Sequence, residues 1–296
     1  MVTLFLILFP LLVFPTFDSE QDETLVDFDL VEKLIENERN HDLLLYLDDV
    51  LKQNPEDILA LNLRGAVLYD LERYDEAIES FDKALEINSE NVIALKNKGK
   101  TLAAFEKYEE AITYFDKALE IDPKFVQAWN NKGHSLYHLG KYYEALVQFD
   151  EALLIDPEYI RAINNKGITL ARIGHYNEAI IYFDKALFID PEYFKALNNK
   201  GLTLYDIGKY EQSLTYFDKA LEIEPENQEL IQNRDKSFVL FKVVSSILNS
   251  NSIIPIWFTQ NGDWFVNGNI TKEEFVSGIE YLVEQGIIKD DVINQA

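Results

Sequence analysis

Apolar residues recur along most of the chain with the three-to-four-residue spacing of amphipathic helices. In residues 126–159, a first run carries Trp129 and Leu136, and a second carries Phe149 and Leu153. Each run predicts a helix that is apolar along one face and polar along the other. Pro157 follows the second run and marks its end, because proline lacks the N–H group that continues a helix. The pattern therefore predicts pairs of helices joined by short turns.

This helical pattern repeats with a period of 34 residues. One column holds Gly65, Gly99, Gly133, Gly167 and Gly201, and a second holds Phe81, Phe115, Phe149, Phe183 and Phe217. Tyrosine, alanine and proline recur in the same register, for example at Tyr142, Ala145, Ala152 and Pro157. The small residues let the two helices of a copy approach closely, and each phenylalanine is expected to fill space between neighbouring copies. Because neither helix of a copy can bury its apolar face alone, the copies must stack.

The copy VQAWNNKGHSLYHLGKYYEALVQFDEALLIDPEY at 126–159 resembles the tetratricopeptide repeat in its period and in its small, Tyr, Ala, Phe, Ala and Pro positions. The resemblance covers five copies over residues 58–227 and implies an all-α fold, a right-handed α-solenoid of stacked antiparallel helix pairs. Residues 18–57 are strongly acidic and carry apolar residues at helical spacing, with a polar break at 37–42. They are expected to form a degenerate first helical repeat, and residues 228–250 a capping helix.

In this family the first helix of each copy lines a concave groove, which would place one asparagine per copy there. These asparagines are Asn97, Asn131, Asn165 and Asn199. A primary amide both donates and accepts hydrogen bonds, so it can pair with both groups of a peptide backbone. The resemblance adds that such asparagine ladders hold peptide backbones in some members. The alternative is that these amides bond neighbouring helices of the same protein.

Cationic and aromatic residues accompany the asparagines in the predicted groove. They are Lys96, Lys100, Arg161, Lys195, Tyr137 and Tyr205. In a chain of net charge −25, a locally basic groove would favour an acidic or carboxylate-bearing segment of a protein or peptide partner. The alternative is that the lysines only balance acidic neighbours. The family's carboxylate clamp is not fully reproduced, so the tail of a chaperone is not an expected ligand.

The composition of the chain argues against several other functions. A net charge of −25 opposes binding to nucleic acid, and the absence of cysteine excludes disulfides, thiolate zinc sites and cysteine nucleophiles. His134 and His138 share one helix face, but no third ligand is placed beside them, so they are expected to be groove or packing residues and not a metal site. No catalytic motif is present, and we expect neither an enzyme nor a cofactor.

The two ends of the chain differ from the repeats. Residues 1–17 are apolar and of signal-peptide length, although they lack basic residues. We expect a signal peptide or a membrane anchor, hence an exported or membrane-anchored protein that touches the membrane only through this segment. A cytoplasmic protein is the alternative.

Residues 254–296 are expected to form a small helical module, with Thr271 and Glu274 as a capping box. The segment resembles a short module that recurs in predicted exported proteins of archaea.

The sequence thus predicts a scaffold that binds an extended peptide or a helix of a partner protein in its concave groove. One alternative is a structural or assembly factor of the cell envelope that acts through the convex surface and the C-terminal module. Another is a regulatory subunit of an intracellular complex.

Overall fold

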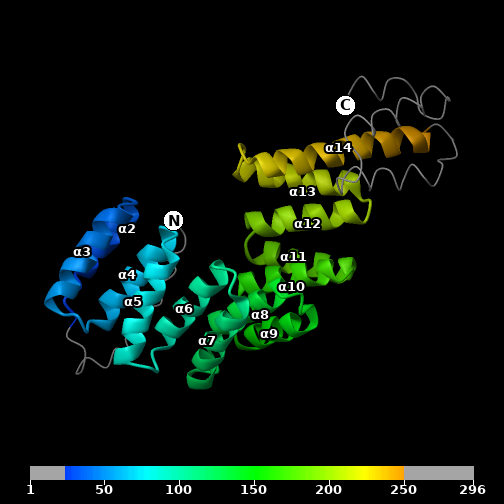
Figure 1. Ribbon diagram of the computed structural model, residues 1–296. Coiled ribbons are helices and arrows are strands. Elements are labelled where there is room, and N and C mark those ends of the chain that lie inside the picture. Colours follow the sequence, from blue (N-terminus) through cyan, green and yellow to red (C-terminus); the bar gives the residue numbers. More distant parts are fainter. Residues whose placement is uncertain (1–23, 250–296) are drawn as a thin grey trace. The chain divides into compact units, whose positions relative to one another are not determined.

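The computed structural model of the protein describes residues 24–249, and the regular secondary structure in this part of the chain is α-helical. Thirteen helices follow one another in it, in consecutive antiparallel pairs (Figure 1). Their bounds are α2 (Phe28–Glu36), α3 (Asn40–Gln53), α4 (Ile58–Asp70), α5 (Tyr74–Ile87), α6 (Val92–Ala104), α7 (Tyr108–Ile121), α8 (Val126–His138), α9 (Tyr142–Ile155), α10 (Ile160–Arg172), α11 (Tyr176–Ile189), α12 (Phe194–Asp206), α13 (Tyr210–Ile223) and α14 (Gln228–Asn249). The predicted all-α stack of helix pairs is confirmed.

The chain forms two compact units, residues 1–165 and 166–296, and the division lies within α10. In the first unit, consecutive helices from α2 through to α9 pack on one another. In the second unit α11 packs on α12, α12 on α13, and α13 on α14. The predicted N-terminal segment at 1–17 and the C-terminal module at 254–296 lie outside the described residues.

In the first copies, the first helix of each pair begins at a side-chain cap. The Asp57 carboxylate accepts a hydrogen bond from the Ala60 N–H at 2.9 Å at the start of α4, and Asn91 accepts one from the Ala94 N–H at 2.8 Å at the start of α6. Such caps satisfy N–H groups that have no partner inside the helix. Within the predicted degenerate first repeat the structure describes α2 and α3, and α3 begins at Asn40, inside the predicted polar break. Asp42 lies in its first turn, where an acidic side chain favours a helix N-terminus.

The turn between the two helices of a copy passes through left-handed backbone at one position. Glutamate occupies it in the first three copies, with φ of 59° at Glu72, and glycine in the later ones, with φ of 75° at Gly140. A residue with a Cβ atom is less stable in this conformation than glycine. The turn geometry is therefore common to all copies, whereas the residue that suits it best appears only in the later ones.

The glycine column allows the two helices of a copy to touch. A Cβ atom placed on Gly133 would lie 2.6 Å from Cε1 of Phe149, which is closer than carbon atoms pack. Phe149 is fully buried and shares its cluster with Leu136 of its own copy and Ala162 of the next. The phenylalanine therefore fills space between neighbouring copies as predicted, and its ring also lies against the glycine of its own copy.

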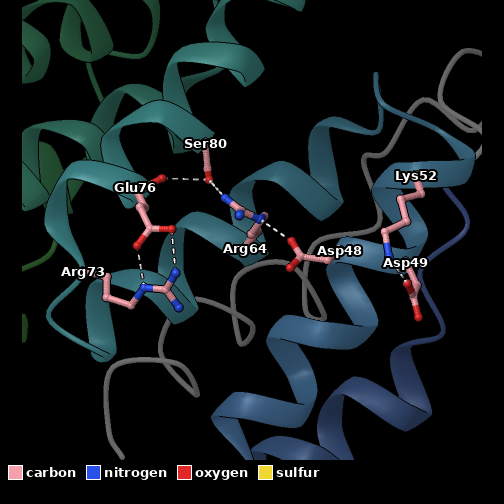
Figure 2. Close-up of polar contacts among 7 residues, drawn as sticks. All are labelled: Asp48, Asp49, Lys52, Arg64, Arg73, Glu76 and Ser80. Carbon is pink, nitrogen blue, oxygen red and sulfur yellow. Dashed lines mark hydrogen bonds and ion pairs between the residues drawn. The ribbon is translucent and has the colours of Figure 1, made fainter.

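Ion pairs join successive copies at a second recurring position. Arg64 on α4 donates from Nε to Asp48 on α3 at 2.6 Å and from an η nitrogen to the Ser80 hydroxyl on α5 at 2.7 Å (Figure 2). The corresponding Lys98 pairs with Asp82, and Lys132 pairs with Asp116 at 2.6 Å. Lys200 with Asp184, and Arg234 with Asp218, repeat the arrangement in the second unit. At this position, cations of the first helices are balanced by acids of the preceding copy.

Candidate functional site

The first helices of neighbouring copies touch one another in the first unit, since α4 contacts α6 and α6 contacts α8. In a curved stack, elements on the inner side come closest together, so we assign the first helices to the inner side. The predicted site residues are distributed over these helices. Lys96, Asn97 and Lys100 lie on α6, Asn131 and Tyr137 on α8, Arg161 and Asn165 on α10, and Lys195, Asn199 and Tyr205 on α12.

Asn97 is buried without a hydrogen-bond partner for its side chain. Only 2% of the residue is exposed, and neither Nδ2 nor Oδ1 is bonded to any described residue. Leaving a buried amide unpaired costs free energy, on the order of 1–3 kcal/mol. In the preceding copy the equivalent position holds the fully buried Leu63, which has no such cost. The preceding copy thus packs a leucine at the position where this copy has an unpaired amide.

The next two asparagines of the predicted ladder are linked by a residue that the sequence analysis missed. Asn130 on α8 is buried, its Nδ2 donates to Oδ1 of Asn131 at 3.3 Å, and its Oδ1 accepts from Nδ2 of Asn165 at 3.0 Å. Asn165 therefore bonds a neighbouring helix, as the alternative interpretation held. Nδ2 of Asn131 makes no hydrogen bond within residues 24–249 and remains available. Asparagine recurs at the Asn130 position as Asn62, Asn164 and Asn198, and this column was visible in the sequence.

Lys96 is half-buried, and no carboxylate among the described residues pairs with it. Burial lowers the pKa of Lys96 to about 7, and repulsion from Lys100 and Arg161 acts in the same direction. A lysine that is buried without a counter-ion loses the solvation of its charge, so its neutral form is favoured. Lys96 thus lies near other cations and has no acidic partner among the described residues.

Lys100 lies over an aromatic ring in the same region. Its Nζ is 4.0 Å from the centroid of the Tyr69 ring, a cation–π geometry. Burial lowers the pKa of Lys100 to about 8, which Asp70 opposes and Arg161 reinforces. Burial also raises the pKa of Asp70, and the charge of Lys100 opposes this rise.

Arg161 completes the group from α10. It is exposed, and it acts to lower the pKa of Tyr159, which burial nevertheless raises. Arg161 repels both lysines and Lys100 repels Lys96, which adds to the lowering of the lysine pKa values by burial. The three cations of the first unit thus lie near one another, with Asp70 beside Lys100, and Lys96 differs from the lysines that are paired with acids.

The predicted residues of the second unit lie on α12. Lys195 is exposed and Asn199 is half-buried. The rings of Tyr205 and Tyr210 meet at 5.4 Å between centroids, which fixes the Tyr205 ring at the end of α12. In the first unit Tyr137 makes the equivalent contact with Tyr142, also at 5.4 Å. Both tyrosines therefore stabilise the turn between the helices of their copy.

Comparison with known protein families identifies the family of this chain. Profiles described as the tetratricopeptide repeat match residues 56–124, 126–159, 160–193 and 194–227, more than half of the chain. The chain belongs to the tetratricopeptide repeat family. Proteins with these repeats generally take part in protein–protein interaction and are typically not enzymes. A search of curated protein sequences gives no match.

Solved structures with similar folds include three with 24% identity or less. PilW, a type IV pilus biogenesis factor, aligns with a TM-score of 0.63 and 24% identity over 69% of this chain and 94% of its own. The Pseudomonas aeruginosa pilF protein aligns with a TM-score of 0.58 and 18% identity over 70% and 95% of the two chains. A thermophilic tetratricopeptide repeat protein of Thermus thermophilus, TTC0263, gives 0.55 and 20% over 62% and 99%. At these identities the similarity concerns the fold of this tetratricopeptide repeat protein.

The histidine pair of the tetratricopeptide repeat protein lies on α8. The Nε2 atoms of His134 and His138 are 3.3 Å apart, and the His138 ring stacks on Tyr108 at 4.9 Å between centroids. Within residues 24–249, no group of three side chains is placed to hold a metal ion. In the same range, no helix has the length and apolar character needed to cross a membrane.

Proposed function

We propose that this protein is a non-enzymatic scaffold that holds an extended peptide or a helix of a partner protein against the inner side of its first helices. Membership of an interaction-repeat family supports the general role. The observation that carries the finer proposal is Asn97, whose side-chain amide is buried and unpaired. A peptide backbone supplies both the acceptor and the donor that this amide lacks.

Asn131 offers the corresponding donor on the next copy. Its Oδ1 is held by Asn130, which fixes the amide while leaving Nδ2 available. Because a ligand reaches Asn97 only when neighbouring side chains move, we expect binding to rearrange side chains on α6. Long lysine side chains change rotamer at little cost, so this requirement is compatible with ordinary peptide affinity.

A display library of random 12-residue peptides tests the proposal on the full chain. We expect selected peptides to bind with micromolar dissociation constants by isothermal titration calorimetry. The variant N97A/N131A/N165A/N199A should bind them at least tenfold more weakly with an unchanged helical circular dichroism spectrum. N177A, at an exposed position of α11, serves as the matched control and should bind normally. Failure to select any peptide, or equal binding by the quadruple variant, would contradict the proposal.

A second candidate function uses the outer side of the stack, as expected for an assembly factor. In the first unit Tyr143 and Leu154 of α9 are 71% and 76% exposed, and in the second unit Phe188 of α11 is 89% exposed. The equivalent of Leu154 and Phe188 is glutamate in the other three copies, at Glu86, Glu120 and Glu222. If this surface carries the function, L154E should abolish assembly while the asparagine variant has no effect.

We also propose that the protein is exported or anchored through residues 1–17. The support is the apolar sequence of that segment. N-terminal sequencing of the protein from its native source is the test. A sequence that begins after residue 17 supports a cleaved signal, an intact Met1 in the membrane fraction supports an anchor, and an intact Met1 in the cytosol contradicts both.

A further inference from the structure

A column of tyrosines on the second helices of the copies is interrupted in the third copy. The column holds Tyr114 on α7, Tyr182 on α11 and Tyr216 on α13. Gln148 on α9 stands at the equivalent position of the third copy, and Ser80 at that of the first. The third copy therefore lacks a ring that the second, fourth and fifth copies carry.

Where the tyrosine is present, its ring packs on apolar residues and its hydroxyl bonds a lysine. In the second copy Tyr114 packs against the cluster that contains Leu102. The Tyr114 hydroxyl accepts a hydrogen bond from Nζ of Lys98 at 2.7 Å. The fifth copy repeats this bond between Lys200 and Tyr216 at 2.6 Å. The position thus suits a ring that carries a hydroxyl group.

The third copy has a hollow at this place. Its volume is about 370 Å³, and it is lined by residues of α7, α8 and α9 (Figure 1). Leu136, the equivalent of Leu102, lies in its wall together with Gln148. The other apolar residues of the wall are Ile112, Leu139 and Val147. The hollow therefore corresponds to the place that a tyrosine ring fills in the second copy.

Two polar groups of the hollow match a phenol hydroxyl. Lys132 is the equivalent of Lys98, and its Nζ pairs with Asp116 at 2.6 Å. An ammonium group has three donors, so Lys132 can also bond a hydroxyl oxygen, as Lys98 does. Oε1 of Gln148 is buried and accepts no hydrogen bond within residues 24–249, so it can take the hydroxyl proton once the amide turns toward the hollow. A ring without a hydroxyl would leave this oxygen unpaired.

The charges at the hollow favour a neutral ligand. Glu109 and Glu144 are exposed beside the cations Lys132 and Lys141. Asp116 already neutralises Lys132. A charged ligand would lose solvation without meeting an excess of the opposite charge, whereas a tyrosine side chain is uncharged at neutral pH.

The rim of the hollow is exposed, so the ligand can be carried on a larger molecule. Val147 is 54% exposed, and Lys141 and Glu144 are exposed as well. A free small molecule is usually held in a pocket that covers about 70–90% of its surface. A side chain needs no such enclosure, because the backbone that carries it stays outside. A tyrosine of a protein therefore suits this hollow better than a free phenol.

We propose that the hollow between α7, α8 and α9 binds a tyrosine side chain of a partner protein, which takes the place of the ring missing at Gln148. The ring lies on Ile112 and Leu136, and the hydroxyl bonds Lys132 and Gln148. None of these residues belongs to the predicted groove. The inference therefore goes beyond the proposed peptide groove and is tested separately.

The test uses the full chain with ¹³C-labelled leucine and valine methyl groups and three probes. The probes are N-acetyl-tyrosine amide, N-acetyl-phenylalanine amide, which lacks only the hydroxyl, and p-cresol, which is the tyrosine side chain without a backbone. The readout is the chemical shift of the Leu136 and Val147 methyls, assigned by their loss in L136M and V147I. Leu154 on α9 is 76% exposed and reports non-specific adsorption of the probes.

We expect the tyrosine probe to shift the Leu136 and Val147 methyls saturably, with a dissociation constant on the order of a millimolar, and to leave Leu154 unchanged. The phenylalanine probe should bind at least threefold more weakly, because it forms no bond to Lys132 or Gln148. The p-cresol probe should bind no more tightly than the tyrosine probe.

The variant Q148Y gives the third copy the tyrosine of its neighbours. Its ring should enter the hollow, shift the Leu136 methyls upfield and weaken binding of the tyrosine probe at least fivefold. N177Y adds a tyrosine at an exposed position of α11 and is the matched control, which should bind the probe normally.

Several results would overturn the tyrosine site. A phenylalanine probe that binds within threefold of the tyrosine probe, or an equal shift at Leu154, would show apolar adsorption only. Tighter binding of p-cresol than of the tyrosine probe would assign the hollow to a free phenol. Normal binding by Q148Y, or unshifted Leu136 methyls in that variant, would show that the hollow is not the place of the missing ring. No saturable shift with any probe up to 20 mM would show that the hollow binds none of them. The peptide library decides the scaffold proposal independently of all these results.

Discussion

Lys96 and Lys98 lie two residues apart on α6 and have opposite surroundings. Lys98 donates from Nζ to Asp82 and to the Tyr114 hydroxyl at 2.7 Å, and its side chain is 10% exposed. Burial alone would lower the pKa of Lys98, but the bonds to Asp82 and Tyr114 outweigh it, so the pKa lies above its ordinary value. Burial lowers the pKa of Lys96 to about 7, with repulsion from neighbouring cations in support.

The difference shows that one helix can place the same residue type in two settings, one paired within the fold and one without an acidic partner. The face with Lys98 and Gly99 contacts the neighbouring helices, and its polar groups are satisfied within the fold. The face with Lys96 and Asn97 retains charge and an amide that the fold does not use. Counting charged residues does not separate these roles, because only the presence of a partner distinguishes them.

The largest loss of unfolding free energy is expected from substitutions on the face of α6 that holds Lys98 and Gly99. A Cβ atom on Gly99 would lie 2.6 Å from Cε1 of Phe115, so G99A forces the ring or the helix to move. We expect a loss of about 2 kcal/mol in unfolding free energy, because overpacking a well-packed core costs about 1–3 kcal/mol. Urea denaturation followed by circular dichroism measures it.

The matched control is G140A, where nothing lies within 4 Å of an added Cβ and φ is 75°. Its cost arises only from the left-handed backbone, about 1 kcal/mol. The double variant G99A/F115L should recover part of the loss. Equal losses in G99A and G140A would show that the contact with Phe115 is not limiting.

The second-largest loss of unfolding free energy is expected from replacing Lys98, the lysine that is paired with Asp82. K98M leaves Asp82 and the Tyr114 hydroxyl without their partner, and we expect a loss of about 1–2 kcal/mol in unfolding free energy. The lower end applies if Asp82 rehydrates, since its side chain is 45% exposed. Denaturation of K98M beside K96M gives the comparison directly. A loss of equal size in K96M would remove the distinction between the two faces.

The fold could be predicted from sequence because packing residues recur in register. Gly133, Phe149 and Pro157 have equivalents in successive copies, and each is required by a contact or a helix end. The start of α3 at Asn40 was missed because polarity alone does not exclude a first helical turn. The division between the two units was not predictable, since it falls inside α10 with no break in composition.

The site could be predicted only in part. Sequence placed Lys96 and Asn97 on a first helix but left open whether such lysines are balanced by acids. The answer for Lys98 depends on Asp82, which lies 16 residues earlier on another helix. The recurrence of this pairing in register was available as a signal and was overlooked. The bridge made by Asn130 depends on side-chain rotamers, which a column of residue types does not specify.

Removing the unpaired amide should stabilise the protein. N97L replaces a buried group without hydrogen bonds by the residue found at position 63. We expect a gain of about 1 kcal/mol in unfolding free energy, the size of the penalty for an unsatisfied buried group. Urea denaturation measures the gain, and N131L, at a half-buried amide bonded to Asn130, is the comparison. A clear loss of stability in N97L would mean that Asn97 is structurally required, which would weaken its assignment to the site.

The smallest expected effect is a pH-dependent gain from removing Lys96. Below pH 7 the lysine is charged in both the folded and the unfolded chain, so folding bears the full cost of its burial. Between pH 7 and the ordinary value of 10.5, the folded state carries the neutral form and this cost shrinks as pH rises. K96M should therefore raise the unfolding midpoint by about 2 °C at pH 6 and by less at pH 9. Thermal unfolding at both pH values, with K83M as the exposed control, measures the difference. A gain that is the same at the two pH values would show that the charge of Lys96 is solvated, and that the inner face of α6 has no excess charge to offer a ligand.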